Sequence, residues 1–155
     1  MDFHRKSPRA TFHNYSGGCY FITICTAGKQ HFFGEIINGE IKLSEIGIFT
    51  EKQISQLKEH YTYCNPILWV VMPNHLHLLI EVLSTDRLPQ ERMAASVIIG
   101  GLKRSVTLYA KRNNIEFAWQ PRYHDHIIRG NHDAKLIEEY IMNNVAKWSD
   151  DCFFS

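Results

Sequence analysis

The run Ile67-Leu-Trp-Val-Val-Met-Pro-Asn-His-Leu-His-Leu-Leu-Ile-Glu-Val82 decides the fold of this chain. Its two apolar segments, Ile67–Met72 and His75–Val82, have the composition of strands. Only Pro73-Asn74, a pair typical of tight turns, separates them. Strands joined by so short a link pair antiparallel, because parallel strands need a long crossover connection. The sequence therefore predicts an antiparallel pair of core strands.

Two histidines share one face of the second strand. His75 and His77 project together, while Leu76 points into the opposite layer. Two imidazoles on a rigid face can occupy adjacent coordination positions of a divalent metal. They could also be unrelated surface histidines, since the chain holds nine and His124-Asp125-His126 makes a second pair. The apolar residues that flank the first pair, and are missing around the second, favour metal binding by His75 and His77.

The rest of the chain alternates short strands with helices. The predicted elements are a strand at 19–25, a hairpin at 32–43 around Asn38-Gly39, a helix capped by Ser44, a stop at Asn65-Pro66, a helix at about 90–112 interrupted by Gly100-Gly101, a strand at 123–129 and a helix capped by Asp133 that runs to about 147. This order predicts an α+β fold, in which helices cover one face of an antiparallel sheet. Residues 1–155 form a single domain, with residues 1–18 as a polar, basic arm.

Composition excludes several classes of protein. Hydrophobic residues make up 45% of the 155 residues and charged residues 21%, which is typical of a folded globular chain. No apolar run is long enough to span a membrane, and the first residues do not resemble a secretory signal. The four cysteines form no CxxC pair, so we expect buried, reduced thiols and a cytoplasmic protein.

The net charge of +1 argues at first against nucleic-acid binding. The charge is uneven, however: residues 91–130 carry seven Lys and Arg against three acidic residues, and residues 1–20 carry three against one. Lys103-Arg104 and Lys111-Arg112 lie about two helical turns apart, so they face the same way. Aromatic and arginine side chains follow at 119–123 and suit contacts with bases and phosphates. The alternative is an ordinary solvated helix face.

Tyr140 and Asn144 lie four residues apart in the last predicted helix and share a face. The tyrosine could act as a nucleophile, and the amide oxygen could be a third metal ligand. The alternative is the polar edge of an amphipathic helix. The chain has no GxSxG motif, Walker loop or dinucleotide glycine fingerprint.

Together these motifs resemble the single-tyrosine HUH transposases of bacterial insertion sequences, and most closely the REP-associated tyrosine transposases. The resemblance covers nearly the whole chain. It is carried by Gly18–Cys25, Trp69–Leu79, Gly101–Thr107, Trp119–Arg129, Tyr140–Asn144 and Lys147-Trp148. It implies a palm of the ferredoxin or RRM type. One departure is Val145, where the family often has proline, so the helix is expected to continue past Asn144.

The resemblance implies a metal-dependent enzyme that cleaves and rejoins hairpin-flanked single-stranded DNA through a 5′-phosphotyrosine intermediate. Tyr140 matches the nucleophile, and His75, His77 and Asn144 match the ligands of Mg²⁺ or Mn²⁺. The natural DNA contacts are Arg5, Lys6, Arg9, Lys103, Arg104 and Arg122. His126 lies in a shared motif without an assigned role.

The resemblance also implies an imperfect DNA hairpin as partner, no nucleotide cofactor, and a place in the bacterial cytoplasm at the nucleoid. Family members act as homodimers that can exchange the tyrosine helix, or as monomers. Two other functions are open: an inactive nucleic-acid-binding module of the same fold, and a metal-dependent hydrolase of small phosphoesters that uses the histidine pair. The second would leave Tyr140 without a purpose.

Overall fold

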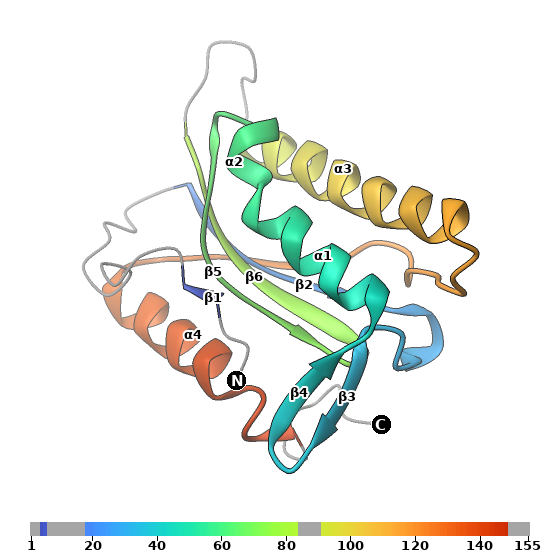
Figure 1. Cartoon of the computed structure of the whole chain (residues 1–155). Helices are drawn as coiled ribbons and strands as arrows, with labels where there is room; N and C mark the ends of the chain where they lie inside the picture. The colour runs from blue at the N-terminus through green and yellow to red at the C-terminus, as the bar shows by residue number, and fades with distance from the viewer. Residues whose placement is uncertain (1–3, 6–17, 84–90, 149–155) are drawn as a thin grey trace.

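The computed structural model describes residues 4–5, 18–83 and 91–148, and side chains within 18–83 and 94–148. Its centre is a five-stranded antiparallel sheet in the order β1-β5-β6-β2-β7 (Figure 1). The strands are β1 (His4–Arg5), β2 (Cys19–Cys25), β5 (Cys64–Met72), β6 (His75–Val82) and β7 (His124–Ile127). The predicted β5–β6 hairpin is confirmed, with Met72 opposite His75. The predicted stop at Asn65-Pro66 is wrong, because both residues lie inside β5. A bulge between Pro66 and Leu68 accommodates the proline in the strand.

Three helices cover one face of the sheet (Figure 1): α1 (Glu45–Ser55), α2 (Leu57–His60) and α3 (Glu91–Arg112). They pack on the alternate strand residues that include Ile22, Leu76 and Leu78. Ser44 begins α1 as predicted, since its side chain accepts a hydrogen bond from the Gly47 N–H at 3.2 Å. The predicted interruption at Gly100-Gly101 is wrong, because α3 runs through both glycines without a break.

The fourth helix corrects the prediction that helices cover one face only. Helix α4 (Asn131–Asn143) lies on the opposite face of the sheet (Figure 1). Its Ala134 and Ile141 pack with Val70 and Leu79 of the strands in a second apolar core. Both faces of β5 and β6 are apolar and must be covered, and for this reason the sheet needs a helix on each side.

A separate hairpin flanks the sheet. It consists of β3 (Gly34–Ile37) and β4 (Glu40–Leu43), and a short 3₁₀ turn, η2 (Ala27–Lys29), precedes it. Asn38 and Gly39 both have positive φ angles, of 53° and 78°, as the predicted two-residue turn requires. This hairpin contributes partly buried Ile36 and Leu43 to the core beneath α4.

The predicted burial is confirmed for the cysteines Cys19, Cys25 and Cys64. Burial raises the pKa of Cys64 to about 12, so this thiol is inert at neutral pH. Cys152 and most of the basic arm lie outside the described residues. Within the described part of the chain, no helix is long and apolar enough to cross a membrane.

Candidate active site

The two predicted metal ligands face each other beneath α4. His75 and His77 are 0% and 1% exposed, and their Nε2 atoms lie 3.1 Å apart. Two nitrogens that bind one cation at about 2.1 Å and at about a right angle are separated by about 3.0 Å. The pair therefore has the spacing of two adjacent ligands on one metal ion, and the reading of two unrelated surface histidines is wrong.

Hydrogen bonds at the far side of each ring orient this pair. His75 Nδ1 lies 2.8 Å from Asn74 Oδ1, and His77 Nδ1 lies 2.9 Å from Thr23 Oγ1. The Asn74 amide NH₂ donates to the Lys29 carbonyl at 3.4 Å, which leaves its oxygen to accept from His75. Asn74 therefore fixes the proton of His75 on Nδ1, whereas the Thr23 hydroxyl can accept from or donate to His77 Nδ1.

Tyr140 lies against this pair within the same chain. Its ring centroid is 5.1 Å from that of His77 and 6.2 Å from that of Phe21, while Phe21 also stacks on His77 at 5.2 Å. The tyrosine is 39% exposed, whereas the histidine beneath it is buried. A large molecule could therefore reach the phenol from outside while the imidazole stays shielded.

The turn that follows α4 covers the other histidine. The chain continues in helical turns after Asn143, with Lys147 N–H donating to the Asn143 carbonyl at 3.0 Å. These turns bring Trp148 over His75, with ring centroids 6.2 Å apart and planes 19° apart. Helix α4 itself ends at Asn143, before the predicted end near 147, and buried Val145 lies in the turns that follow it.

Asn144 is the C-cap residue at the end of α4. In the sequence it is four residues from Tyr140 and four from Trp148. Asn144 is 3% exposed, and its buried Oδ1 atom has no hydrogen-bond partner among the described residues. A buried amide oxygen without a partner is costly, and a cation bound there would satisfy it.

The donor set fits a divalent metal. Two imidazole nitrogens and one amide oxygen are donor types that suit Mn²⁺ or Mg²⁺, with manganese favoured by the nitrogens. Among the described residues, no three His, Cys, Asp or Glu side chains are arranged to hold a metal, so a third protein ligand there would be of another type, such as Asn144.

The predicted DNA contacts on α3 lie across the sheet from the histidines. The Lys103 ammonium donates to the carbonyls of Gln120 and Arg122, both at 3.1 Å, and desolvation lowers its pKa. Trp119 is held in turn, since its Nε1–H donates to the Lys103 carbonyl at 3.0 Å and its ring packs on Phe117. Lys103 and Trp119 thus fasten the loop to α3.

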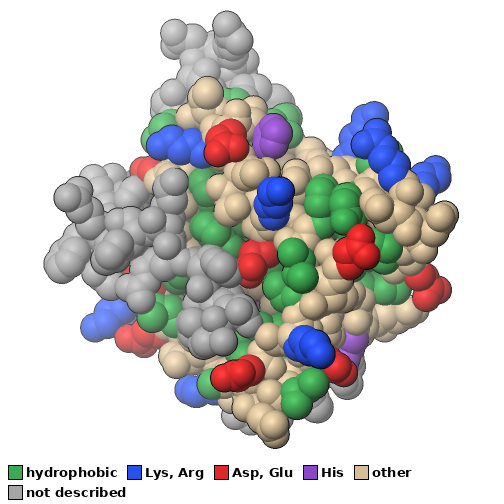
Figure 2. Space-filling model, in the orientation of Figure 1, with side chains coloured by type: hydrophobic (Ala, Val, Ile, Leu, Met, Phe, Trp, Pro, Cys, Tyr) green, Lys and Arg blue, Asp and Glu red, His purple; other side chains and the backbone are tan. Residues whose placement is uncertain are grey.

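The other residues predicted to contact DNA are exposed to solvent or have side chains outside the described part of the chain. Arg104 and Arg122 are exposed. Lys and Arg side chains gather over the C-terminal half of α3, which ends in Lys111 and Arg112 (Figure 2). Arg5 lies in edge strand β1, although its side chain is outside the description, as are Lys6 and Arg9. The role of these residues in DNA binding stays a prediction.

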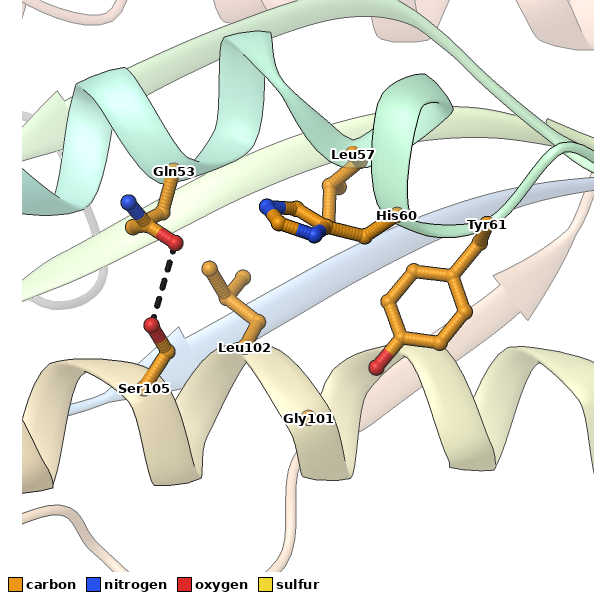
Figure 3. Close-up of a pocket in the computed structure, with 7 residues that line it drawn as sticks. All are labelled: Gln53, Leu57, His60, Tyr61, Gly101, Leu102 and Ser105. Carbon is orange, nitrogen blue, oxygen red and sulfur yellow. Dashed lines mark hydrogen bonds between the residues drawn. The ribbon is translucent and has the colours of Figure 1, made fainter.

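A hollow on the α3 side is separate from the histidines. It has a volume of about 320 Å³ between α1, α2 and α3. Ser105 donates to the Gln53 side chain at 3.0 Å across it, and the Tyr61 hydroxyl points to Gly101 (Figure 3). This hollow lies on the sheet face opposite His75 and His77.

Three residues that contact His75 or His77 were not predicted as part of the site: Thr23, Asn74 and Trp148. The Thr23–His77 contact depends on the register of β2 against β6, in which these residues are opposite each other. No local pattern reveals that register. Trp148 had a signal, because Lys147-Trp148 is among the motifs that carry the family resemblance.

No model of a known protein family matches the chain. An uncharacterized protein of Haemophilus influenzae is 34% identical over 165 residues, which cover 96% of this chain and 92% of the relative.

Two solved structures share the fold. A REP-associated tyrosine transposase bound to a REP hairpin superposes with a TM-score of 0.62 at 19% identity, over 96% of this chain and 74% of that chain. A proposed transposase from Deinococcus radiodurans R1 superposes with a TM-score of 0.52 at 16% identity, over 92% and 97%.

Proposed function

Because the chain belongs to the same family as the Haemophilus influenzae protein and has the fold of the single-tyrosine transposases, we propose that it cleaves and rejoins single-stranded, hairpin-flanked DNA. The observation that carries the proposal is the contact of Tyr140 with His77, 5.1 Å between ring centroids, beside the paired Nε2 atoms. A nucleophile and two metal ligands meet there in one chain. The similar structure that contains a REP hairpin supports a DNA hairpin as the substrate class.

Tyr140 would supply the nucleophile. Its Oη atom would bond to a backbone phosphorus, the bond from that phosphorus to the 3′ oxygen would break, and the product would be a 5′-phosphotyrosine and a free 3′-OH. The proton that the phenol loses is balanced by the one that the 3′ oxygen gains. In the reverse direction, a second 3′-OH would attack the phosphotyrosine and restore the phenol. The linkage stores the bond energy, so no nucleotide cofactor is needed.

The buried side chains would prepare the site for a metal. His75, His77 and Asn144 would hold Mn²⁺ or Mg²⁺, and the hydrogen bonds from Asn74 and Thr23 would keep the imidazoles in place. Such an ion, when bound, offsets negative charge on the phosphate in the transition state. Phe21 would orient the Tyr140 ring against His77.

The test is covalent trapping. We would incubate the protein with Mn²⁺ and 3′-labelled single-stranded hairpins whose flanks are randomised, then denature it and look for labelled protein. A 3′ label follows the strand whose 5′ end is attached to tyrosine. We expect an adduct that is lost in Tyr140→Phe, in His75→Ala and with EDTA. The matched control Tyr109→Phe, on α3 across the sheet, should form it normally.

Other results would identify the alternatives. Hairpin binding without an adduct would indicate a non-catalytic DNA-binding module. Hydrolysis of a small phosphodiester by Tyr140→Phe would favour a metal-dependent hydrolase. An adduct that survives Tyr140→Phe would show that another residue is the nucleophile.

We further propose that one chain is sufficient for cleavage, because Tyr140 contacts His77 of its own chain. An exchanged tyrosine helix in a homodimer stays a prediction of the family resemblance. A mixture of Tyr140→Phe and His77→Ala chains distinguishes cleavage within one chain from exchange between chains, since only exchange would restore activity.

We expect the protein to act in the bacterial cytoplasm on nucleoid DNA, which fractionation would test.

A further inference from the structure

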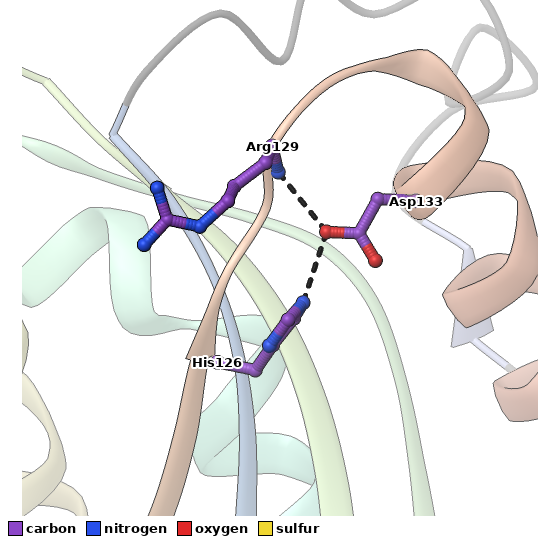
Figure 4. Close-up of polar contacts among 3 residues, drawn as sticks. All are labelled: His126, Arg129 and Asp133. Atoms are coloured by element: carbon purple, nitrogen blue, oxygen red, sulfur yellow. Dashed lines mark hydrogen bonds and ion pairs between the residues drawn. The ribbon is translucent and has the colours of Figure 1, made fainter.

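One carboxylate holds the junction between β7 and α4. Asp133 Oδ2 accepts from His126 Nε2 at 2.9 Å and from the Arg129 backbone N–H at 3.0 Å (Figure 4). Desolvation opposes ionisation of Asp133, but the hydrogen bonds from Arg129 and His126 and the neighbouring histidine charges outweigh it and lower its pKa. The proposed cleavage reaction gives His126 no role, although its motif is part of the family resemblance.

The junction needs such a contact because α4 begins without a conventional cap. The residue before the helix is Gly130, whose φ of 114° few other residues adopt, and no side chain caps it. Asp133 is the third residue of the helix, not the cap predicted from the sequence. From there its side chain reaches back to Arg129 and takes over part of the capping function.

The same contact is linked to the tyrosine. His126 lies opposite Phe21 in the pairing of β7 with β2, and the Phe21 ring contacts both His77 and Tyr140. Asp133 and Tyr140 are seven residues apart, which is about two helical turns and places them on one side of α4. The His126–Asp133 contact thus fixes the beginning of the helix to the strand beside Phe21, on the side that carries Tyr140.

We propose that His126 and Asp133 form a positioning pair that holds α4 in place and keeps Tyr140 over His77. The importance of this position for cleavage rests on the proposed function, whereas the effect on the helix does not. The two side chains are 51% and 29% exposed. A contact so accessible to water contributes little to global stability, so its main effect is on the geometry of the helix.

Kinetics test the consequence for cleavage. We would compare His126→Ala and Asp133→Ala with the wild type on a hairpin recovered from the trapping experiment, measuring single-turnover adduct formation at saturating DNA and the Kd in EDTA. We expect the rate to fall about tenfold or more, as small displacements of reacting groups produce, with the Kd changed less than about twofold. His126→Gln should restore most of the rate, because its amide can donate to Asp133 from the Nε2 position. Exposed Lys135→Ala, near the same end of α4, is the control and should match the wild type.

Aromatic and amide NMR test the position of the helix without DNA. The wild type should show NOEs between the Tyr140 and His77 rings, which weaken in His126→Ala and recover in His126→Gln. Amide exchange should accelerate in 127–144 only, with the melting temperature changed by less than about 2 °C.

Three outcomes would overturn the proposal: unchanged NOEs and exchange, acceleration throughout the chain, or a weaker Kd with an unchanged rate, which would make His126 a DNA contact. If the wild type forms no adduct, the proposed function fails alone, and the NOEs still decide whether the pair holds Tyr140.

Discussion

The Nε2 atoms of His75 and His77 lie 3.1 Å apart on one face of β6, and both rings are buried beneath α4. The contact is a hydrogen bond when one ring carries its proton on Nε2, and it presents two lone pairs to a shared cation when both rings carry the proton on Nδ1. Because their Nδ1 atoms contact Asn74 and Thr23, the rings cannot turn away without losing hydrogen bonds. The distance of 3.1 Å also suits two ligands of one cation.

Asn144→Ala should weaken Mn²⁺ binding about tenfold or more, because it removes a buried oxygen that no described residue hydrogen-bonds. Isothermal titration of the DNA-free protein measures the affinity. Asn143→Ala is the matched control, since the neighbouring amide is exposed and donates to the Glu139 carbonyl. Equal affinities for the two variants would exclude Asn144 as a ligand.

Thr23→Val should weaken Mn²⁺ binding by about ten- to a hundredfold, because the valine has the same shape but cannot bond His77 Nδ1. Thr23→Ser keeps the hydroxyl and should bind nearly as well as the wild type. Mn²⁺ electron paramagnetic resonance reports the bound fraction. If Thr23→Val binds normally, packing alone orients His77.

Lys103→Met should lower the free energy of unfolding by about 1–2 kcal/mol, because the carbonyls of Gln120 and Arg122 lose their charged donor. The exposed neighbour Arg104→Met should leave stability within about 0.5 kcal/mol. Urea unfolding measures the free energy of unfolding of both variants. If Arg104 contacts DNA as predicted, its variant alone should bind the hairpin more weakly without being less stable.

Gly101→Ala should be less stable than Gly100→Ala by about 1 kcal/mol or more, although both lie in the middle of α3. A Cβ at Gly101 would collide with the Tyr61 hydroxyl, whereas one at Gly100 meets nothing within 4 Å (Figure 3). Gly100→Ala should even stabilise the protein by up to about 1 kcal/mol through helix propensity. Thermal unfolding of both variants provides the comparison, and equal melting temperatures would mean that Tyr61 moves freely.

Local patterns predicted much of the fold. Strand β2, the Asn38-Gly39 turn and the Ser44 cap depend on neighbouring residues, and each is where the sequence placed it. Errors arose where packing outweighs local preference. Gly100 and Gly101 are poor helix formers, yet the packing of α3 on the sheet keeps the helix continuous. Asp133 has the residue type of a helix cap, but it is the third residue of α4, and its side chain accepts a hydrogen bond from the Arg129 N–H.

The sequence by itself determined that His75 and His77 share a face and that Tyr140 and Asn144 share another, because strand and helix periods fix which side chains align. Only the tertiary structure decided that these two faces meet. Helix α4 must cover the second apolar face of the sheet, which brings Tyr140 to His77 and leaves α3 with Lys103 on the other side. That choice depends on contacts between residues far apart in the chain, and local periodicity does not encode them.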